Sequence, residues 1–150
     1  RPRQASLRRA VSAAYYALFH HLIDESTRLA LGSATATRRH RQTLGRAYSH
    51  ASLAAACRAF AAALPPRQLA AALHRELVPE ALQTVAATFL DLQEQRHRAD
   101  YDLSAPFTRN EVRRLLAQLD AALTAWRTIR GTSVARLFLS LLPVWDKLRG

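Results

Sequence analysis

The sequence predicts an all-α protein, and three observations support this prediction. Only four glycines and six prolines occur in 150 residues, and they separate long stretches rich in Ala, Leu and Arg, which favour helix. Within these stretches, apolar residues recur at three- and four-residue steps, the period of an amphipathic helix. A hydrophobic content of 49% against 22% charged residues provides enough apolar side chains for a core. We expect a single domain over residues 1–150, built as an antiparallel bundle of helices.

The first helix is expected from about Ala5 to Leu31, with Gly32 placed to end it and residues 32–37 as a connector. Its core-facing stripe consists of Leu7, Val11, Ala14, Leu18 and Leu22. The next helix is expected to continue without a break towards Pro65, because proline cannot extend a helix. Its apolar positions are Leu44, Tyr48, Leu53, Ala56 and Phe60.

A short helical segment is expected from Arg67 to Leu77. Pro79 suits the first turn of a longer helix, whose apolar face reaches Arg96. That face consists of Leu82, Val85, Ala86, Phe89, Leu90 and Leu92. Residues 102–106 interrupt the pattern and predict a loop.

The final third of the chain predicts two more helices. Thr108 and Glu111 have the spacing of a capping box, which marks a helix start, and Gly131 marks its end. The stripe between them consists of Val112, Leu115, Leu116, Leu119, Leu123 and Trp126. A last amphipathic helix is expected over residues 133–142, closed by Pro143.

The charge of the chain favours an anionic partner. Lys and Arg number 22 against 11 Asp and Glu, a formal net charge of +11, so RNA, DNA or an acidic protein would be attracted. The single cysteine, Cys57, excludes an internal disulfide and a cysteine-rich zinc site, and it is interpreted as a small core residue. No metal or cofactor motif occurs, and no apolar run approaches about 18 residues. We expect a cytoplasmic protein that has no membrane contact and no cofactor.

The densest polar cluster is the segment Arg96-His-Arg-Ala-Asp-Tyr-Asp102. On a helix, Arg96 and Asp100 are four residues apart and share a face. One interpretation is a surface ion pair with Tyr101 packed beside it. The other is a phosphate-facing arginine that Asp100 holds in place, with Tyr101 as a stacking partner and Arg98 as a further nucleic-acid contact. The residues by themselves leave both interpretations open.

Basic and histidine residues elsewhere are further candidates for the site. Arg38, Arg39 and Arg41 form a basic cluster that is either a solvated helix start or a phosphate contact. Arg46 and His50 are one turn apart on the expected second helix and would complete a composite site beside Arg96. The adjacent histidines at 20 and 21 point about 100° apart on a helix, so at most one of them lines a given cleft.

Two motifs in this order resemble the HEPN family of helical nucleotide-binding domains. The first is Arg8-Arg-Ala-Val-Ser-Ala-Ala-Tyr-Tyr-Ala-Leu-Phe-His20, and the second is the Arg96–Asp102 segment, followed by Phe107-Thr108 at a helix start. The resemblance implies an antiparallel four- or five-helix bundle that forms a homodimer, with a polar site facing the dimer cleft. Many members are metal-independent endoribonucleases or toxins, and some are encoded beside a nucleotidyltransferase partner.

Catalytic members of that family carry an arginine and a histidine separated by four to six residues. Arg96 matches the arginine, but the three positions where the histidine would fall hold Tyr101, Asp102 and Leu103. Tyrosine, with a pKa near 10, is a poor proton acceptor at neutral pH. The leading hypothesis is therefore an RNA- or nucleotide-binding protein of a toxin–antitoxin or defence module. The alternatives are an endoribonuclease in which His50 supplies the proton transfer, and a structural dimerisation module or nucleotidyltransferase partner.

Overall fold

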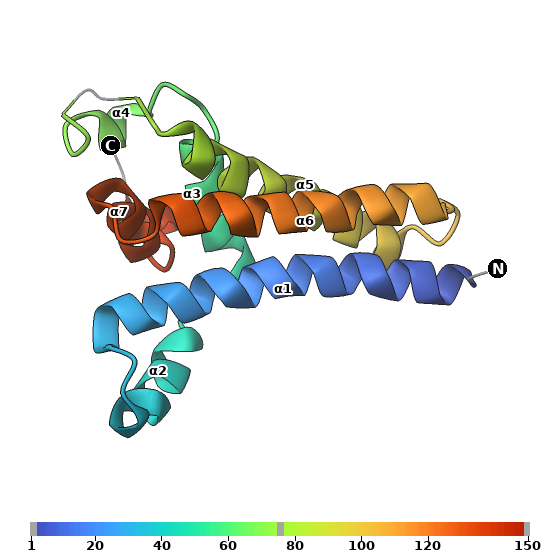
Figure 1. Ribbon diagram of the computed structural model, residues 1–150, viewed down its shortest axis with the longest axis horizontal. Helices are drawn as coiled ribbons and strands as arrows, with labels where there is room; N and C mark the ends of the chain where they lie inside the picture. Colours follow the sequence, from blue (N-terminus) through green and yellow to red (C-terminus); the bar gives the residue numbers. More distant parts are fainter. Residues whose placement is uncertain (1–2, 75–76, 149–150) are drawn as a thin grey trace.

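A computed structural model describes residues 3–74 and 77–148 of the protein (Figure 1). Over these residues the chain is helical and contains no β-strand, which confirms the predicted all-α class. The helices are α1 (Gln4–Leu31), α2 (Arg38–Gly45), α3 (His50–Phe60), α4 (Arg67–Ala70), α5 (Glu80–Tyr101), α6 (Arg109–Ile129) and α7 (Ser133–Leu141). Two 3₁₀ turns accompany them, η1 (Thr35–Thr37) and η2 (Trp145–Lys147).

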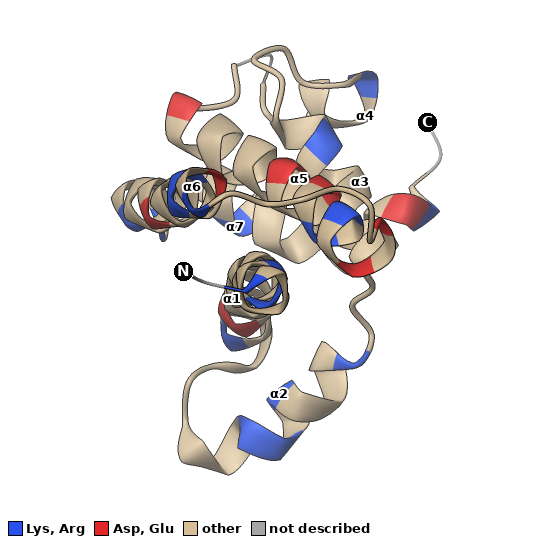
Figure 2. Ribbon diagram, turned by 90° about the vertical axis from the view of Figure 1, so that its right-hand side faces the viewer, with Lys and Arg blue, Asp and Glu red and all other residues tan. Residues whose placement is uncertain are grey.

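The three long helices lie side by side and form the body of a helical bundle (Figure 1). α5 runs antiparallel to α1 and α6, and it packs against both of them and against α3. α7 packs on the carboxyl-terminal part of α1, while α2 stands on the other side of α1, apart from the bundle (Figures 1 and 2). None of the described helices is long and apolar enough to cross a membrane.

α1 matches its prediction closely because its signals are local. The predicted stripe of Leu7, Val11, Ala14, Leu18 and Leu22 is buried in the core. The helix ends before Gly32, which has a φ of 77°, a left-handed conformation that glycine adopts without steric cost. α1 is therefore a rigid support whose exposed and half-buried faces can carry a site.

The prediction of one continuous second helix is wrong. α2 ends at Gly45, and α3 begins at His50 after Ser49, whose hydroxyl accepts a 3.0 Å hydrogen bond from the backbone N–H of Ser52. This cap satisfies a backbone donor and starts a new helix. Arg46 and His50 consequently do not share a helix face: Arg46 is exposed at the end of α2, whereas His50 opens α3.

α4 is shorter than predicted, and α5 is longer. α4 ends at Ala70, Leu77 is not helical, and residues 75–76 of the predicted segment lie outside the described residues. α5 begins after Pro79, as expected, and continues to Tyr101. The whole of the polar cluster from Arg96 to Tyr101 is therefore helical, which gives its side chains fixed directions.

The predictions for the last two helices are largely confirmed. Thr108 caps α6 by accepting a 3.1 Å hydrogen bond from the backbone N–H of Glu111, and α7 begins after Thr132. Trp126 is buried, as predicted. Leu116 does not belong to the core, since it is 41% exposed on the outer side of α6 next to the buried Leu115.

Candidate functional site

Arg96 lies on the face of α5 that packs against α1, inside a group of tyrosine rings. Its guanidinium carbon is 5.7 Å from the ring centre of Tyr15, 5.3 Å from that of Tyr16 and 5.8 Å from that of Tyr101. Its Nη2 donates a 3.0 Å hydrogen bond to the Tyr16 hydroxyl, and the side chain is only 15% exposed. Contacts of a guanidinium with aromatic faces are attractive, so the rings fix the position of the charge.

Asp100 pairs with Arg96, as the four-residue spacing predicts. The Nε of Arg96 lies 2.9 Å from Oδ2 of Asp100. The N–H does not point along this contact, and within the described residues the buried Nε has no hydrogen-bond partner of acceptable geometry. The pair is therefore a charge contact rather than an aligned hydrogen bond.

His50 approaches the same tyrosines from the start of α3. Its ring stacks on Phe19 with 4.3 Å between ring centres, and its Nδ1 lies 2.6 Å from the Tyr15 hydroxyl. Burial lowers the pKa of His50, and the positive charge of Arg96 lowers it further. The imidazole is therefore neutral at physiological pH, with Nδ1 engaged by Tyr15 and Nε2 as its second nitrogen.

The tyrosine pair on α1 links the arginine to the histidine. The Tyr15 and Tyr16 ring centres are 5.3 Å apart. Arg96 forms a hydrogen bond with Tyr16, and His50 forms one with Tyr15. Burial raises the pKa of Tyr15 to about 12, so its hydroxyl stays protonated. We call the set of Tyr15, Tyr16, His50, Arg96, Asp100 and Tyr101 the Arg96 cluster. It joins three helices, and the sequence reasoning missed the part that Tyr15 and Tyr16 play in it.

Of the two adjacent histidines on α1, only one lies beside this cluster. His20 is exposed and stacks on Tyr16 with 5.8 Å between ring centres. His21 instead lies 3.9 Å from the carboxylate of Glu25. The expectation that at most one of the pair could line a given cleft agrees with this arrangement.

Arg98, two residues from Arg96, points to another side of α5. Its Nη1 lies 3.2 Å from the Glu111 carboxylate, its Nη2 donates to the carbonyl of Pro106 at 2.7 Å, and its guanidinium lies over the Phe107 ring. Side chains two apart on a helix are separated by about 200°. Arg98 thus ties α5 to the start of α6 and stands outside the Arg96 cluster.

Arg8 has a structural role that the sequence reasoning missed. Its Nη1 donates to the carbonyls of Ala99 at 2.7 Å and Asp102 at 3.0 Å, and its Nη2 donates to those of Leu103 and Ala105. The last carbonyls of a helix have no partners within the helix, so Arg8 closes the end of α5. One signal was available: Arg8 adjoins Leu7 at the edge of the buried stripe of α1.

The arginines predicted on the second helix lie along α2, away from Arg96. Arg41 holds the preceding turn, donating from Nη1 to the carbonyls of Gly32 and Ala34 and to the Thr37 hydroxyl. Arg38, Arg39 and Arg46 are exposed. Within the described parts of the chain, no hydrogen bond or ion pair joins these arginines to the Arg96 cluster.

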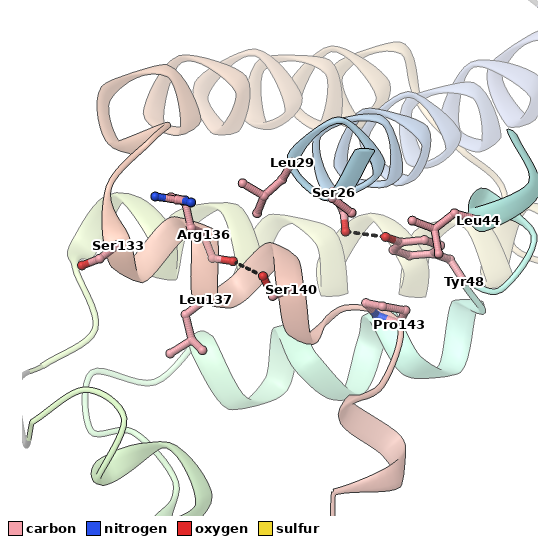
Figure 3. Close-up of a pocket in the computed structure, with 10 residues that line it drawn as sticks. Ser26, Leu29, Leu44, Tyr48, Ser133, Arg136, Leu137, Ser140 and Pro143 are labelled. Atoms are coloured by element: carbon pink, nitrogen blue, oxygen red, sulfur yellow. Dashed lines mark hydrogen bonds between the residues drawn. The ribbon is translucent and has the colours of Figure 1, made fainter. Parts of the chain in front are cut away.

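A separate groove of about 600 Å³ lies between α1 and α7 (Figure 3). Tyr48 lines it, and its hydroxyl forms a hydrogen bond with that of Ser26, so Tyr48 does not accompany His50 into the Arg96 cluster. Aliphatic side chains and Arg136 form much of the remaining wall. This groove opens to solvent where α7 packs on α1, and none of the residues that line it belongs to the Arg96 cluster.

The described residues contain no group of three or more His, Cys, Asp or Glu side chains that could hold a metal ion. Cys57 is completely buried, and burial raises the pKa of its thiol, which fits the core role expected for it. The side chains of the Arg96 cluster offer guanidinium, imidazole, phenol and carboxylate groups.

The chain matches no protein-family model, no curated protein and no solved structure. A fold class alone does not specify a function, so the function has to be inferred from the residues of the site.

Proposed function

We propose that this protein is a HEPN-type helical domain that binds RNA through the Arg96 cluster. The observation that carries the proposal is the placement of Arg96 among three tyrosine rings, with Nε against Asp100, Nη2 on the Tyr16 hydroxyl and part of the side chain still exposed. A positioned guanidinium suits a phosphate, and aromatic faces suit unstacked bases. Tyr101, which is 69% exposed, offers such a face at the rim of the cluster.

The same proposal includes a homodimer, as the family resemblance implies. Leu103, which is 82% exposed, follows the exposed Tyr101 at the end of α5. Apolar groups at this position would be covered if a second copy packed there, and C2 pairing is the commonest assembly. A dimer of this kind would bring two Arg96 clusters to one RNA strand. We place it in a cytoplasmic toxin–antitoxin or defence module, with a nucleotidyltransferase as a candidate protein partner.

Binding of a fluorescently labelled single-stranded RNA, followed by anisotropy, tests the proposal. Arg96→Gln should weaken binding about tenfold, since a hydrogen bond to a charged group contributes roughly 1.5–3 kcal/mol. Arg113→Gln, an exposed position on α6, is the control for loss of one charge. Wild-type affinity should also fall steeply between about 50 and 200 mM salt. Equal effects of the two substitutions, or no RNA binding by the wild type, would contradict the proposal.

A second candidate function, metal-independent RNA cleavage, is favoured by the position of His50. His50 and Arg96 contact adjacent tyrosines, and the imidazole is neutral, as a general base must be. His50 would take the proton from a ribose 2′-hydroxyl, whose oxygen attacks the adjacent phosphorus. The 5′-oxygen would leave with a proton from water, yielding a 2′,3′-cyclic phosphate and a 5′-hydroxyl, and the remaining hydroxide would take the proton from the His50 imidazolium and restore the neutral base. Arg96 would stabilise the negative charge that develops on the phosphate.

Incubation of RNA with the wild-type protein in EDTA separates the two functions. Intact RNA supports binding alone, whereas EDTA-resistant cleavage supports the second function. Cleavage should then be abolished by His50→Gln and by Arg96→Gln, but not by His40→Gln, which changes an exposed histidine on α2. Cleavage that persists in His50→Gln would exclude His50 as the base.

A further inference from the structure

A groove of about 650 Å³ runs between α1 and α2, beyond the Arg96 cluster. α2 stands beside α1, and basic residues occur along its ribbon (Figure 2). The charged residues that line the groove are three arginines and one aspartate, a net charge of +2: Arg28, Arg38, Arg41 and Asp24. Such a concave, positively charged surface attracts an anionic chain.

The charges in the groove are arranged so that the aspartate does not oppose this attraction. The Nε of Arg28 lies 3.0 and 2.9 Å from the two carboxylate oxygens of Asp24, so the positive charge of Arg28 offsets the negative charge of Asp24. Arg41 is anchored through Nη1 to the turn before α2, so its charge is held at the wall of the groove. Arg38 is exposed at the first turn of α2, and among the described residues none forms an ion pair or a side-chain hydrogen bond with it.

His20 connects this groove to the Arg96 cluster. Its side chain lines the groove, and its ring also stacks on Tyr16 at 5.8 Å with a 25° angle between the planes. Tyr16, His20 and Asp24 follow one another at four-residue steps and therefore share one face of α1. From Tyr16 to Arg28, the last residue of α1 that lines the groove, this face extends ~18 Å at 1.5 Å per residue.

We infer that single-stranded RNA bound at the Arg96 cluster continues along α1 into the α1–α2 groove. A base stacks at the exposed ring of His20, and a phosphate further along the strand lies between Arg38 and Arg41. This inference rests on the proposed function and extends it from one arginine to a path of several nucleotides. A single strand is required because bases paired within a duplex cannot stack on protein rings.

The length dependence of RNA binding tests this path. Anisotropy would compare single-stranded RNA of about 2 nucleotides, too short to reach from the Arg96 cluster to Arg38, with RNA of about 12 nucleotides, a length in the range that single-strand-binding domains cover. Arg38→Ala should weaken binding of the longer RNA about fivefold, reduce its salt slope by about 1 and leave the shorter RNA unaffected. Arg39→Ala is the matched control, because Arg39 is exposed on the same helix but does not line the groove. His20→Ala should also weaken binding of the longer RNA, with His40→Ala as its control.

The outcomes distinguish this inference from the proposed function. If Arg96→Gln weakens both RNAs but Arg38→Ala and Arg39→Ala behave alike, the path is wrong and the Arg96 site stands. Tighter binding of a duplex than of the single strand would also overturn the path. If neither RNA binds the wild-type protein, both the site and the path are wrong. Equal circular dichroism spectra of the Arg38 and Arg39 variants exclude loss of α2 as the cause of a difference.

Discussion

The two sides of the carboxyl-terminal end of α5 use arginine differently. On one side, Arg8 donates to carbonyls at the end of α5 and in the following loop, and Arg98 binds Glu111 and Pro106. On the other side, Arg96 lies among tyrosine rings, and its buried Nε lacks an aligned acceptor. Arg8 and Arg98 join separate segments through backbone carbonyls and an ion pair, whereas Arg96 is held mainly by aromatic rings and one carboxylate.

The two arrangements should also contribute differently to the free energy of unfolding. Hydrogen bonds from a charged donor to carbonyls that have no partner within the helix stabilise the folded state. A half-satisfied guanidinium in a nearly buried site carries a desolvation cost that its partners offset only in part. The Arg8 side should therefore contribute more to stability, and the Arg96 side more to binding.

The largest effect is expected for Arg8→Ala. The free energy of unfolding should fall by about 3 kcal/mol, because the carbonyls at the end of α5 lose a charged donor. Urea unfolding followed by circular dichroism measures the change, and Arg9→Ala, at the neighbouring exposed position, is the control. A loss no greater than that of the control would show that the Arg8 hydrogen bonds do not stabilise the fold.

A smaller loss, about 1 kcal/mol, is expected for Arg96→Gln. The substitution removes the Tyr16 hydrogen bond and the ring contacts, but it also removes the cost of a nearly buried charge. The same unfolding experiment applies, and here RNA affinity should change more than stability. A destabilisation equal to that of Arg8→Ala would remove the distinction between the two sides.

The smallest effect concerns the pH dependence contributed by His50. Burial, with Arg96, His20 and His97 nearby, lowers the pKa of His50 in the folded state below its ordinary value of 6.5. At pH values between the lowered pKa and 6.5, the unfolded chain binds more protons at His50 than the folded chain does. The stability that His50 contributes is therefore fully present above pH 6.5 and is lost as the pH falls through this range.

Urea unfolding at pH 7.5 and pH 5.5 measures this contribution. The loss of stability on acidification should be smaller in His50→Gln than in the wild type, and His40→Gln should behave like the wild type. An unchanged pH dependence in His50→Gln would show that His50 does not titrate differently in the folded and unfolded chain.

Much of the helical framework follows from neighbouring residues. The stripe of α1, the glycine that ends it and the Thr108 cap of α6 are local signals, so their boundaries agree with the structure. The break before α3 was missed because Ser49 caps the helix without a glutamate or glutamine three residues later. That one error also placed Arg46 beside His50 and made the proposed pairing of the two wrong.

The sequence by itself determined the long helices and the Arg96–Asp100 pair, because these depend on contacts within a few residues and on the 3.6-residue period. Only the tertiary structure decided which arginines pair with distant backbone carbonyls and which lie among aromatic rings. Arg8 meets α5 across about 90 residues of sequence, and His50 reaches Tyr15 from another helix. The composition of the sequence and the spacing of its arginines do not reveal which guanidinium donors find partners, since the packing of distant helices supplies those partners.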